Sequence, residues 1–391
     1  MRERVSLARC AGYDLEEVEA SLRAALAPLG GIEAFVRPGQ RVVLKPNLLR
    51  PASPDAAATT HPAVVAAVAR LVVAAGAEAL ILDSSGGPNS TAYLTMVHRT
   101  TGMTWAAEAS GARLVADLHA TQVPLAKGLI LHRVDLVREA IEADVLINLP
   151  KLKTHGLTGL TVAVKNLFGL VPGVAKVGYH GRMQEPEAFA KGLLDVSLAS
   201  GAALHIVDAV VGMEGNGPSA GTPREVGAIL AGHSALAVDV AAAALVGRDP
   251  LDVRTTRIAA EAGLCSGRIE DVEIAGDSLE GLQGAPFRLP EGYAPEGHAP
   301  QRQSLFGRIA TGWFSRQLLV TPQAGERCTG CGLCARHCPV DAITMENGRG
   351  VGARARMDAA RCIRCYCCHE LCPALAVELR KPVVGRLLGR F

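Results

Sequence analysis

CTGCGLCARHCP, Cys328–Pro339, and CIRCYCCHELCP, Cys362–Pro373, are two copies of one cysteine pattern near the carboxyl end of the chain. In each copy the cysteines are spaced C-x₂-C-x₂-C-x₃-C, and a proline follows the last of them. Three thiolates two residues apart can wrap a tight loop around three corners of a cubane-shaped cluster, and the fourth cysteine then binds the other cluster. The pattern therefore predicts a small α+β module of the ferredoxin type that holds two [4Fe–4S] clusters.

The crossed ligation assigns the cysteines of the two runs to two sets. The first three of each run belong with the fourth of the other, which ties the two halves into one compact unit. A zinc protein would instead be expected to show paired C-x₂-C knuckles that each close a four-ligand site. The predicted metal ligands are Cys328, Cys331, Cys334 and Cys372 for one cluster, and Cys362, Cys365, Cys368 and Cys338 for the other.

Three cysteines fall outside this pattern. Cys367 sits beside the ligand Cys368, and we interpret it as a bystander, with an alternative-ligand role as the other possibility. Cys10 and Cys265 stand alone in the sequence and are expected to be buried structural thiols. Because the remaining cysteines follow a metal-ligand spacing, they fit a reducing compartment better than a set of disulfides.

Length and composition describe a globular chain with more than one domain. The 391 residues suggest about two to three domains, and 49% hydrophobic with 20% charged residues excludes disorder as the main state. A formal charge of +2 gives no global reason to expect nucleic acid or a membrane surface as partner. The first residues hold no apolar run long enough for a signal peptide or membrane span, so we expect a cytoplasmic protein without a transmembrane segment.

Between residues 40 and 280, short apolar runs alternate with Ala- and Leu-rich stretches at helical spacing. This alternation predicts an α/β fold, a mostly parallel sheet with helices on both faces. Helices are expected from Pro62 to Ala75 and from Ser234 to Val246, each followed by a glycine. The strand candidates are Arg41–Lys45, Ala79–Asp83, Asp144–Asn148, Leu204–Asp208 and Gly227–Ala231.

Changes in composition divide the chain into four segments. Residues 1–280 form the α/β domain, and residues 281–320 form a linker that ends in an amphipathic connector around Leu305–Val320. Residues 321–380 form the ferredoxin-type module, and residues 381–391 form a basic tail. The tail is interpreted as a solvated surface, with a docking or membrane-surface role as the alternative.

Polar residues follow the first two predicted strands, at the edge where open α/β sheets bind ligands. Lys45 and Asn47 flank the proline that ends the first strand. After the second strand, Ser84, Ser85 and Gly86 form a small-residue turn, which is either an ordinary turn or a cradle of backbone amides for an anion. No G-x-G-x-x-G follows a strand and no P-loop occurs, so nicotinamide cofactors and P-loop chemistry are unsupported.

The densest polar stretch runs from Asn148 to Asn166. It contains Lys151, Lys153 and Lys165, and it also contains His155, the one histidine that we single out. We weigh a site for a carboxylate or phosphate group against a solvated loop, and we favour the anion site. Later in the chain, Glu214 lies in a loop rich in glycine and proline, where it is a candidate acid, base or metal ligand.

Several of these segments together resemble the domain of unknown function 362 family. They are KPN at Lys45, DSSG at Asp83, NLPKLKTH at Asn148, AVKN at Ala163 and MEGNGP at Met213. The resemblance implies a bacterial or archaeal cytoplasmic iron–sulfur protein, since members are often fused to a ferredoxin-like domain at the carboxyl end, but it supplies no substrate. His233 departs from the acidic or small polar residue expected there, and if that position touches a ligand, the family's specificity does not carry over to this chain.

We carry three functional hypotheses forward. The leading one is a redox enzyme whose two clusters pass electrons to an anionic substrate or further cofactor, with His155, Glu214 and Lys153 as catalytic candidates. The second is an electron-transfer adaptor whose α/β domain docks a redox partner protein, and the third is a non-redox enzyme with structural or sensory clusters. The candidates for holding the substrate or cofactor are Lys45, Asn47, Ser84, Ser85, Gly86, Lys151, Lys165 and Asn166.

Overall fold

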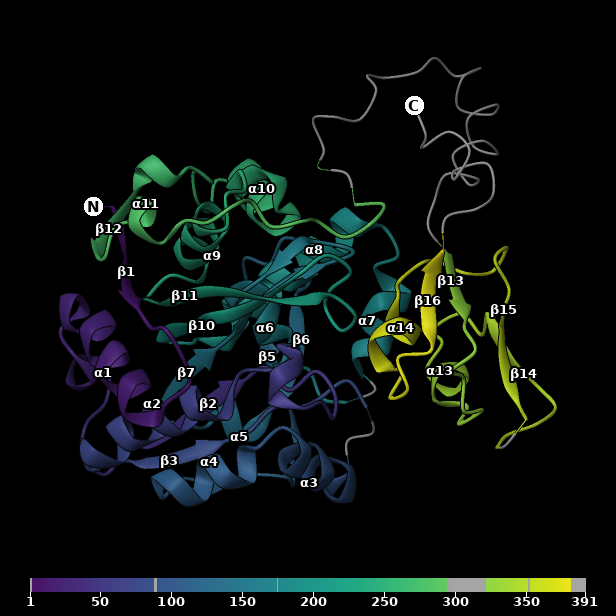
Figure 1. The fold of residues 1–391 in the computed structure, drawn as a ribbon, viewed down its shortest axis with the longest axis horizontal. Coiled ribbons are helices and arrows are strands. Elements are labelled where there is room, and N and C mark those ends of the chain that lie inside the picture. Colours follow the sequence, from purple (N-terminus) through teal and green to yellow (C-terminus); the bar gives the residue numbers. More distant parts are fainter. Residues whose placement is uncertain are drawn as a thin grey trace, which may run out of the picture.

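The computed structural model describes residues 2–87, 90–173, 175–293, 295, 321–350 and 352–380. The predicted connector Leu305–Val320 and the basic tail 381–391 lie outside these ranges, as do residues 294 and 296–304 of the predicted linker. Two bodies are visible in Figure 1: a large α/β domain and, beside it, the small carboxyl-terminal module drawn in yellow.

A mostly parallel sheet forms the centre of the α/β domain, in the order β12-β1-β11-β10-β7-β2-β3-β4. Strand β8 continues the sheet beside β10 and pairs with β9. Only β11 and β9 run antiparallel to their neighbours in the described part of this sheet. The bounds are β1 Glu3–Arg9, β2 Arg41–Pro46, β3 Glu78–Ile81, β4 Arg113–Leu114, β7 Val145–Leu149, β8 Lys151–His155, β9 Gly159–Thr161, β10 Leu204–Glu214, β11 Thr222–Gly232 and β12 Val272–Gly276.

Helices cover both faces of this sheet because successive strand residues point to opposite sides. In β2, Val42 and Leu44 pack in a core with α1 and α2, whereas Val43 packs in the core that contains α8. The remaining elements are a hairpin of β5 and β6 and shorter helices. The bounds are α1 Leu15–Leu26, α2 Pro62–Ala74, α3 Thr91–Thr100, α4 Met103–Ser110, β5 Ala120–Pro124, β6 Arg133–Val137, α5 Arg138–Ile141, α6 Ala163–Leu167, α7 Ala175–Arg182, α8 Pro186–Ser200, α9 Ala235–Leu245, α10 Arg254–Glu261 and α11 Leu279–Leu282.

The predicted α/β class, with a mostly parallel sheet and helices on both faces, is confirmed. Two local expectations need correction. The strand expected at Gly227–Ala231 lies in β11, which runs antiparallel between β1 and β10. The segment from Lys151 to His155, weighed above only as a loop, is the buried strand β8. The lysines of this segment did not indicate a buried strand, because the residues that pair with them lie in distant parts of the chain.

The carboxyl-terminal module is built from two hairpin-like pairs and two short helices. Its bounds are β13 Thr321–Ala324, α13 Leu333–Arg336, β14 Ile343–Glu346, β15 Arg354–Met357, α14 Cys367–Leu371 and β16 Val377–Arg380. Strand β13 pairs with β16, and β14 pairs with β15, both antiparallel.

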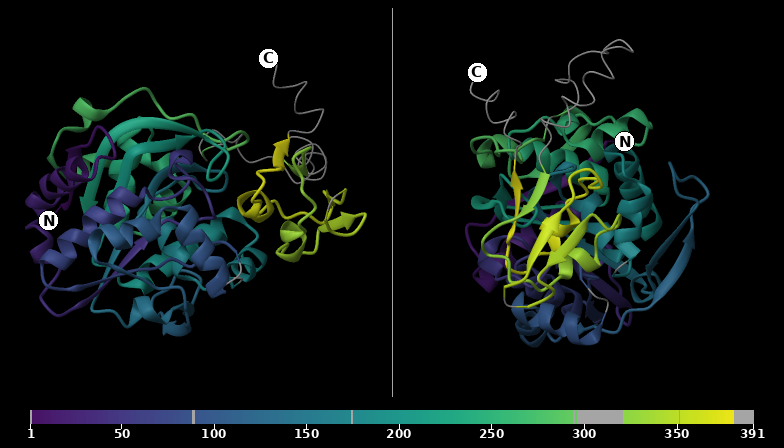
Figure 2. Two further views of the ribbon diagram at one scale, coloured as in Figure 1. Left: turned by 60° about the horizontal axis from the view of Figure 1, so that its bottom comes forward. Right: turned by 90° about the vertical axis from the view of Figure 1, so that its right-hand side faces the viewer.

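The module sits at one end of the α/β domain, with α14 next to α7 and α13 farther away (Figures 1 and 2). Contacts confirm this placement, because Pro339 lies 3.3 Å from the position that a β-carbon on Gly181 of α7 would take. A side-chain methyl group of Leu371 lies 2.8 Å from the corresponding position on Gly86. The module therefore covers the sheet edge where the predicted polar residues follow β2 and β3.

Candidate functional site

The eight predicted cysteine ligands gather in two groups of four. Cys328, Cys331, Cys334 and Cys372 line one cavity, and Cys338, Cys362, Cys365 and Cys368 line the other. Each group combines three cysteines of one run with the fourth of the other, as the crossed ligation predicts. The chain therefore brings together the thiols that could hold a cluster at each place.

The surroundings of these thiols fit a bound cationic centre. Burial, reinforced by neighbouring thiolates, raises the pKa of Cys334 to about 11 and that of Cys368 well above its ordinary value. Thiols that resist deprotonation together need a metal to hold them as thiolates. Backbone N–H groups of Ala342 and Ala376 donate to the sulfurs of Cys338 and Cys372, at 3.2 Å each. Such hydrogen bonds tune a cluster's reduction potential.

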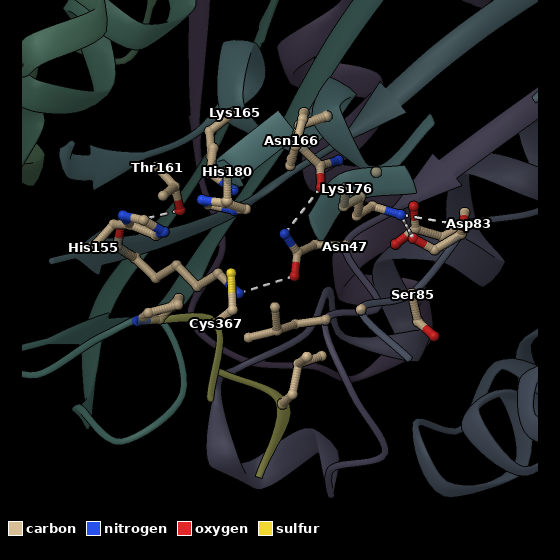
Figure 3. Close-up of a pocket in the computed structure, with 18 residues that line it drawn as sticks. Asn47, Asp83, Ser85, His155, Thr161, Lys165, Asn166, Lys176, His180 and Cys367 are labelled. Atoms are coloured by element: carbon tan, nitrogen blue, oxygen red, sulfur yellow. Dashed lines mark hydrogen bonds between the residues drawn. The ribbon is translucent and has the colours of Figure 1, made fainter. Parts of the chain in front are cut away.

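A separate pocket of about 730 Å³, including its open mouth, lies between the α/β domain and the module (Figure 3). The walls combine cationic and amide side chains with a few apolar ones, and two wall residues come from α14. The lining residues are Asn47, Leu49, Asp83, Ser84, Ser85, Gly86, Lys153, His155, Thr161, Lys165, Asn166, Phe168, Gly169, Lys176, His180, Pro218, Cys367 and Leu371.

The sheet topology explains why distant residues meet here. Strands β2, β3 and β7 are parallel neighbours, with Lys45 opposite Asn148 in the register. Their carboxyl ends therefore share one edge, where Asn47 follows β2 and the turn from Asp83 to Gly86 follows β3. Strand β8 carries Lys153 and His155 onward from β7, and α6 adds Lys165 and Asn166.

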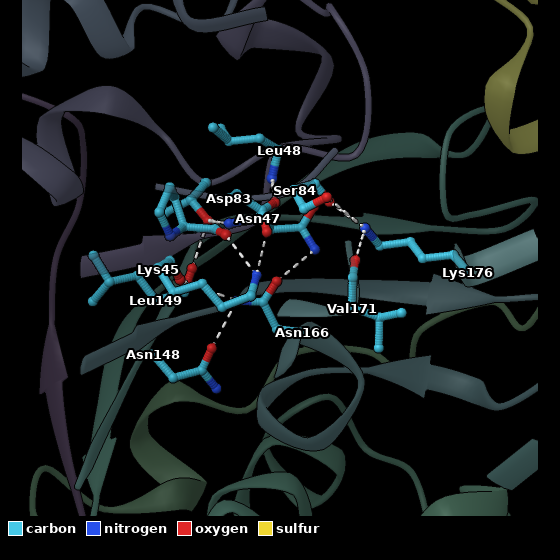
Figure 4. Close-up of polar contacts among 12 residues, drawn as sticks. Lys45, Asn47, Leu48, Asp83, Ser84, Asn148, Leu149, Asn166, Val171 and Lys176 are labelled. Atoms are coloured by element: carbon cyan, nitrogen blue, oxygen red, sulfur yellow. Dashed lines mark hydrogen bonds and ion pairs between the residues drawn. The ribbon is translucent and has the colours of Figure 1, made fainter. Parts of the chain in front are cut away.

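Two predicted lysines are used by the fold and do not line this pocket. The ammonium of Lys45 lies 2.6 Å from Asp83 Oδ1, and the backbone N–H of Leu48 donates to the other oxygen at 2.7 Å (Figure 4). Lys151 pairs with Asp208 at 2.8 Å and also donates to the hydroxyl of Tyr13. Burial lowers the pKa of both lysines against the opposing effect of their carboxylates. The structure thus moves Lys45 and Lys151 from the binding set to buried ion pairs.

A chain of side-chain hydrogen bonds leads from the pocket into the domain. Lys153 donates to Asn47 at 2.9 Å, Asn47 to Asn166 at 3.0 Å, and Asn166 to Asn148 at 2.8 Å. Asn148 is then 3.0 Å from Nδ1 of His205, whose pKa is lowered to about 4 by burial and by His233. A neutral His205 can accept a hydrogen bond from the NH₂ group of Asn148. The NH₂ groups of Asn47, Asn166 and Asn148 therefore all point away from Lys153. The lysine's charge therefore fixes how Asn47 and Asn166 present themselves to the pocket.

Lys176 is a pocket residue that the sequence did not reveal. Its ammonium donates to the carbonyl and hydroxyl oxygens of Ser84 and to the carbonyl of Val171 (Figure 4). Burial lowers its pKa to about 7; the charges of Lys45 and Lys165 add to this, while Asp83 opposes it. No strand or motif precedes Lys176 in the sequence, so no signal marked it.

The other missed wall residues include His180, Phe168 and Cys367. The ammonium of Lys165 lies 5.1 Å from the ring centroid of Phe168, so the face of this ring stabilises the positive charge of Lys165 at the pocket wall. His155 accepts a hydrogen bond at Nδ1 from the N–H of Leu157, at 3.1 Å. The neutral ring must therefore carry its proton on Nε2, the nitrogen that could exchange a proton with a ligand.

Glu214 is not among the residues that line the pocket. It forms ion pairs with Arg224 at 2.9 Å and Arg288 at 2.8 Å, and it accepts the backbone N–H of Arg288. Burial alone would raise the pKa of Glu214, but these contacts hold it below its ordinary value. The predicted acid or base thus serves to join β10 to the segment after Phe287.

Comparisons with known proteins agree with both parts of the chain. The model for a domain of unknown function (DUF362) matches residues 42–244, and that for a 4Fe-4S dicluster domain matches residues 327–376. A thylakoid-associated protein of Synechocystis sp. is 37% identical over 271 residues, which cover 68% of this chain and 81% of that protein.

Among solved structures, the lactate racemase apoprotein from Thermoanaerobacterium thermosaccharolyticum is similar with a TM-score of 0.37 and 14% identity. The match covers 60% of this chain and 54% of that one, about half the racemase's length. No helix among the described residues is long and apolar enough to cross a membrane.

Proposed function

This chain belongs to the domain of unknown function 362 family and carries a 4Fe-4S domain, and on that premise we propose that it is an iron–sulfur oxidoreductase. In this proposal two [4Fe–4S] clusters supply electrons, one at a time, to an anionic substrate or cofactor. The strand-end pocket binds that anion.

One observation carries the proposal: Cys367 lines both the pocket and the cavity of the second cysteine group. A ligand in the pocket would therefore be separated from that group by a single side chain. Tyr366 reinforces the contact, since its ring lies 3.5 Å from the position of a β-carbon on Gly156, the residue after His155. Short separations of this kind favour electron transfer between a cluster and a bound ligand.

The chain's own residues supply binding and proton transfer. Lys153, Lys165 and Lys176 concentrate positive charge on the wall, while the charge of Asp83 is already matched by Lys45. Carboxylate or phosphate groups complement such a wall. Asn47 and Asn166 add amides of fixed orientation, and the turn from Ser84 to Gly86 adds small residues. His155 is the candidate for moving a proton, through Nε2.

The test begins with anaerobically purified protein and mass spectrometry of any small molecule released on denaturation. Carboxylates and phosphates are then titrated calorimetrically into wild-type protein and into Lys153→Met, Lys165→Met and His155→Gln. Lys127→Met, an exposed lysine outside the pocket, is the matched control. We expect an anion that binds the wild type and the control, binds the pocket variants at least about tenfold more weakly, and changes the electron paramagnetic resonance (EPR) spectrum of the reduced protein.

Unchanged affinity in Lys153→Met and His155→Gln would remove the site assignment. An anion that binds without changing the spectrum, in protein that turns nothing over, would favour the electron-transfer adaptor. Activity that survives loss of a cluster in folded protein would favour the non-redox enzyme.

We also propose a cytoplasmic location, since cysteines that hold clusters suit a reducing compartment. The relative from Synechocystis is described as thylakoid-associated. Fractionation of native cells, with the protein followed by antibody, tests this point, and recovery with the membrane fraction at high salt would contradict it.

A further inference from the structure

The module has one side that faces the pocket and another that faces solvent. Of its eight predicted ligands, all of which the structure describes, only Cys331 is exposed. It belongs to the first cysteine group, whereas Cys367 and the pocket adjoin the second. In Figure 1, α13, which begins just after this loop, lies farther from α7 than α14 does.

Three exposed arginines lie near the first cysteine group. Arg336 donates to the carbonyl oxygen of Cys331 at 3.3 Å. Arg349 passes 3.2 Å from the position of a β-carbon on Gly332, in the same loop. Arg327 donates at 2.9 Å to the carbonyl of Leu375, three residues after the fourth ligand of this group. We call Arg327, Arg336 and Arg349 the arginine rim.

The charges of this rim are not neutralised by neighbouring carboxylates. Within the part of the chain that the structure describes, none of the three forms an ion pair within 4.0 Å, whereas Arg356 pairs with Glu346 and Arg380 with Glu378. Glu326, next to Arg327 in sequence, leaves the rim with a positive excess. An exposed ligand inside a positive rim is a surface suited to a negatively charged partner.

We propose that the arginine rim around Cys331 docks an acidic one-electron carrier protein, which makes the first cysteine group the point where electrons enter. In each encounter the carrier is oxidised by one electron and the [4Fe–4S] centre at Cys331 is reduced by one, with no bond broken and no proton moved. The inference rests on the proposed function only in treating the module as an electron acceptor. The opposite side, at Cys367, is then left to the pocket.

The experiment follows electron transfer from a reduced acidic flavodoxin to the full-length protein by anaerobic stopped flow. The test variant is Arg327→Gln/Arg336→Gln/Arg349→Gln. The matched control is Arg354→Gln/Arg356→Gln/Arg361→Gln, three exposed arginines of the same module that bond to Ala324, Glu346 and Val340 and not to the Cys331 loop. Both triple variants remove three formal positive charges, so a larger loss in the rim variant reports the place from which the charge is removed.

We expect the second-order rate constant to fall at least about tenfold in the rim variant at low salt and to stay within about twofold of wild type in the control. The wild-type rate should fall as salt increases, and the rim variant should lose most of this dependence. Equal losses in both triple variants, or a wild-type rate independent of salt, would overturn the proposal. Reduction by dithionite should be unchanged in all three proteins, which shows that the clusters are intact.

If the rim variant loses its clusters, Arg349→Gln and the wild-type salt dependence carry the same test. The docking surface and the pocket can fail separately. If the rim variant loses rate as expected but no anion binds in the pocket, the docking proposal stands and the protein is an electron-transfer adaptor. If Lys165→Met weakens anion binding but the rim variant accepts electrons at the wild-type rate, the oxidoreductase proposal stands and the docking proposal fails.

Discussion

The ferredoxin module and the sheet edge that it covers are encoded in different ways. In the module three predicted ligands of each cluster follow a short spacing and the fourth comes from a second copy of the same pattern, and the structure groups the cysteines in this way. At the sheet edge, residues of one polar stretch separate, with Lys151 in an ion pair and Lys153 on the pocket wall. Residue type alone therefore identifies a site when its geometry is local, and fails when the partners are distant.

The largest expected effect tests the predicted assignment of the module's cysteines to two clusters. Cys372→Ser should abolish the cluster of the first group and leave the second, which lowers the iron content from about eight to about four per chain. Cys331→Ser should give the same residual EPR spectrum, whereas Cys338→Ser should match Cys365→Ser. Cys265→Ser is the control, because it lies outside the module. If Cys338→Ser instead matched Cys331→Ser, the crossed ligation would be wrong.

The next effect compares two lysines of the polar stretch by their stability. Lys151→Met should lower the free energy of unfolding of the α/β domain by about 3–5 kcal/mol, because it leaves the buried carboxylate of Asp208 without its counter-charge. Lys165→Met, at a partly exposed wall position, should cost less than about 1 kcal/mol. Urea unfolding followed by circular dichroism measures both. Similar losses would show that the two lysines do not differ in role.

A smaller effect concerns the pH dependence of the pocket. Since the pKa of Lys176 is lowered to about 7, the side chain gains its charge as pH falls through 7 and loses it as pH rises. Anion affinity should therefore be higher at pH 6 than at pH 8, by up to about tenfold. Lys176→Arg should keep the high affinity at both pH values, and Lys176→Gln the low one. An inflection near pH 7 that persists in Lys176→Gln would show that Lys176 is not the group responsible.

The smallest effect concerns the acidic residue that the structure removes from the site. Glu214→Gln should leave anion affinity unchanged and lower stability by about 1 kcal/mol, since Arg288 is largely exposed and Arg224 partly so. Calorimetric titration and urea unfolding measure the two quantities. A loss of affinity comparable to that of Lys165→Met would return Glu214 to the list of functional residues.

The sequence was sufficient for the features that depend on short-range periodicity. Helices α2 and α9 and the strands β2, β3 and β7 follow the predicted segments closely, because apolar spacing reflects burial of one face or both. Strand β10 begins at Leu204 as predicted but continues past Asp208 to Glu214, so the prediction that Glu214 lies in a loop was wrong. The sequence also identified most of the polar pocket residues, including Asn47, His155 and Asn166, since strand ends of a parallel sheet share one edge. The family resemblance is likewise confirmed.

Other features were outside the reach of sequence patterns. Strand β8 looked like a loop because its lysines find Asp208 and Asn47 far away in the chain. Lys176 and Cys367 reach the pocket from segments with no strand-end signal, and Cys367 does so only because the module docks against α7. Cys367 thus lies on the wall shared by the pocket and the cavity of the second cysteine group, and its interpretation as a bystander of the clusters stays a prediction.

The sequence by itself determined the α/β class and the ferredoxin-type module, because periodicity and spacing along the chain fix each of them. Only the tertiary structure decided which charges are neutralised and which line a cavity. That outcome depends on side chains such as Asp83, Asp208 and Arg288, whose distances from Lys45, Lys151 and Glu214 are set by the packing of the whole domain. Spacing is a property of the chain, whereas charge compensation is a property of the fold.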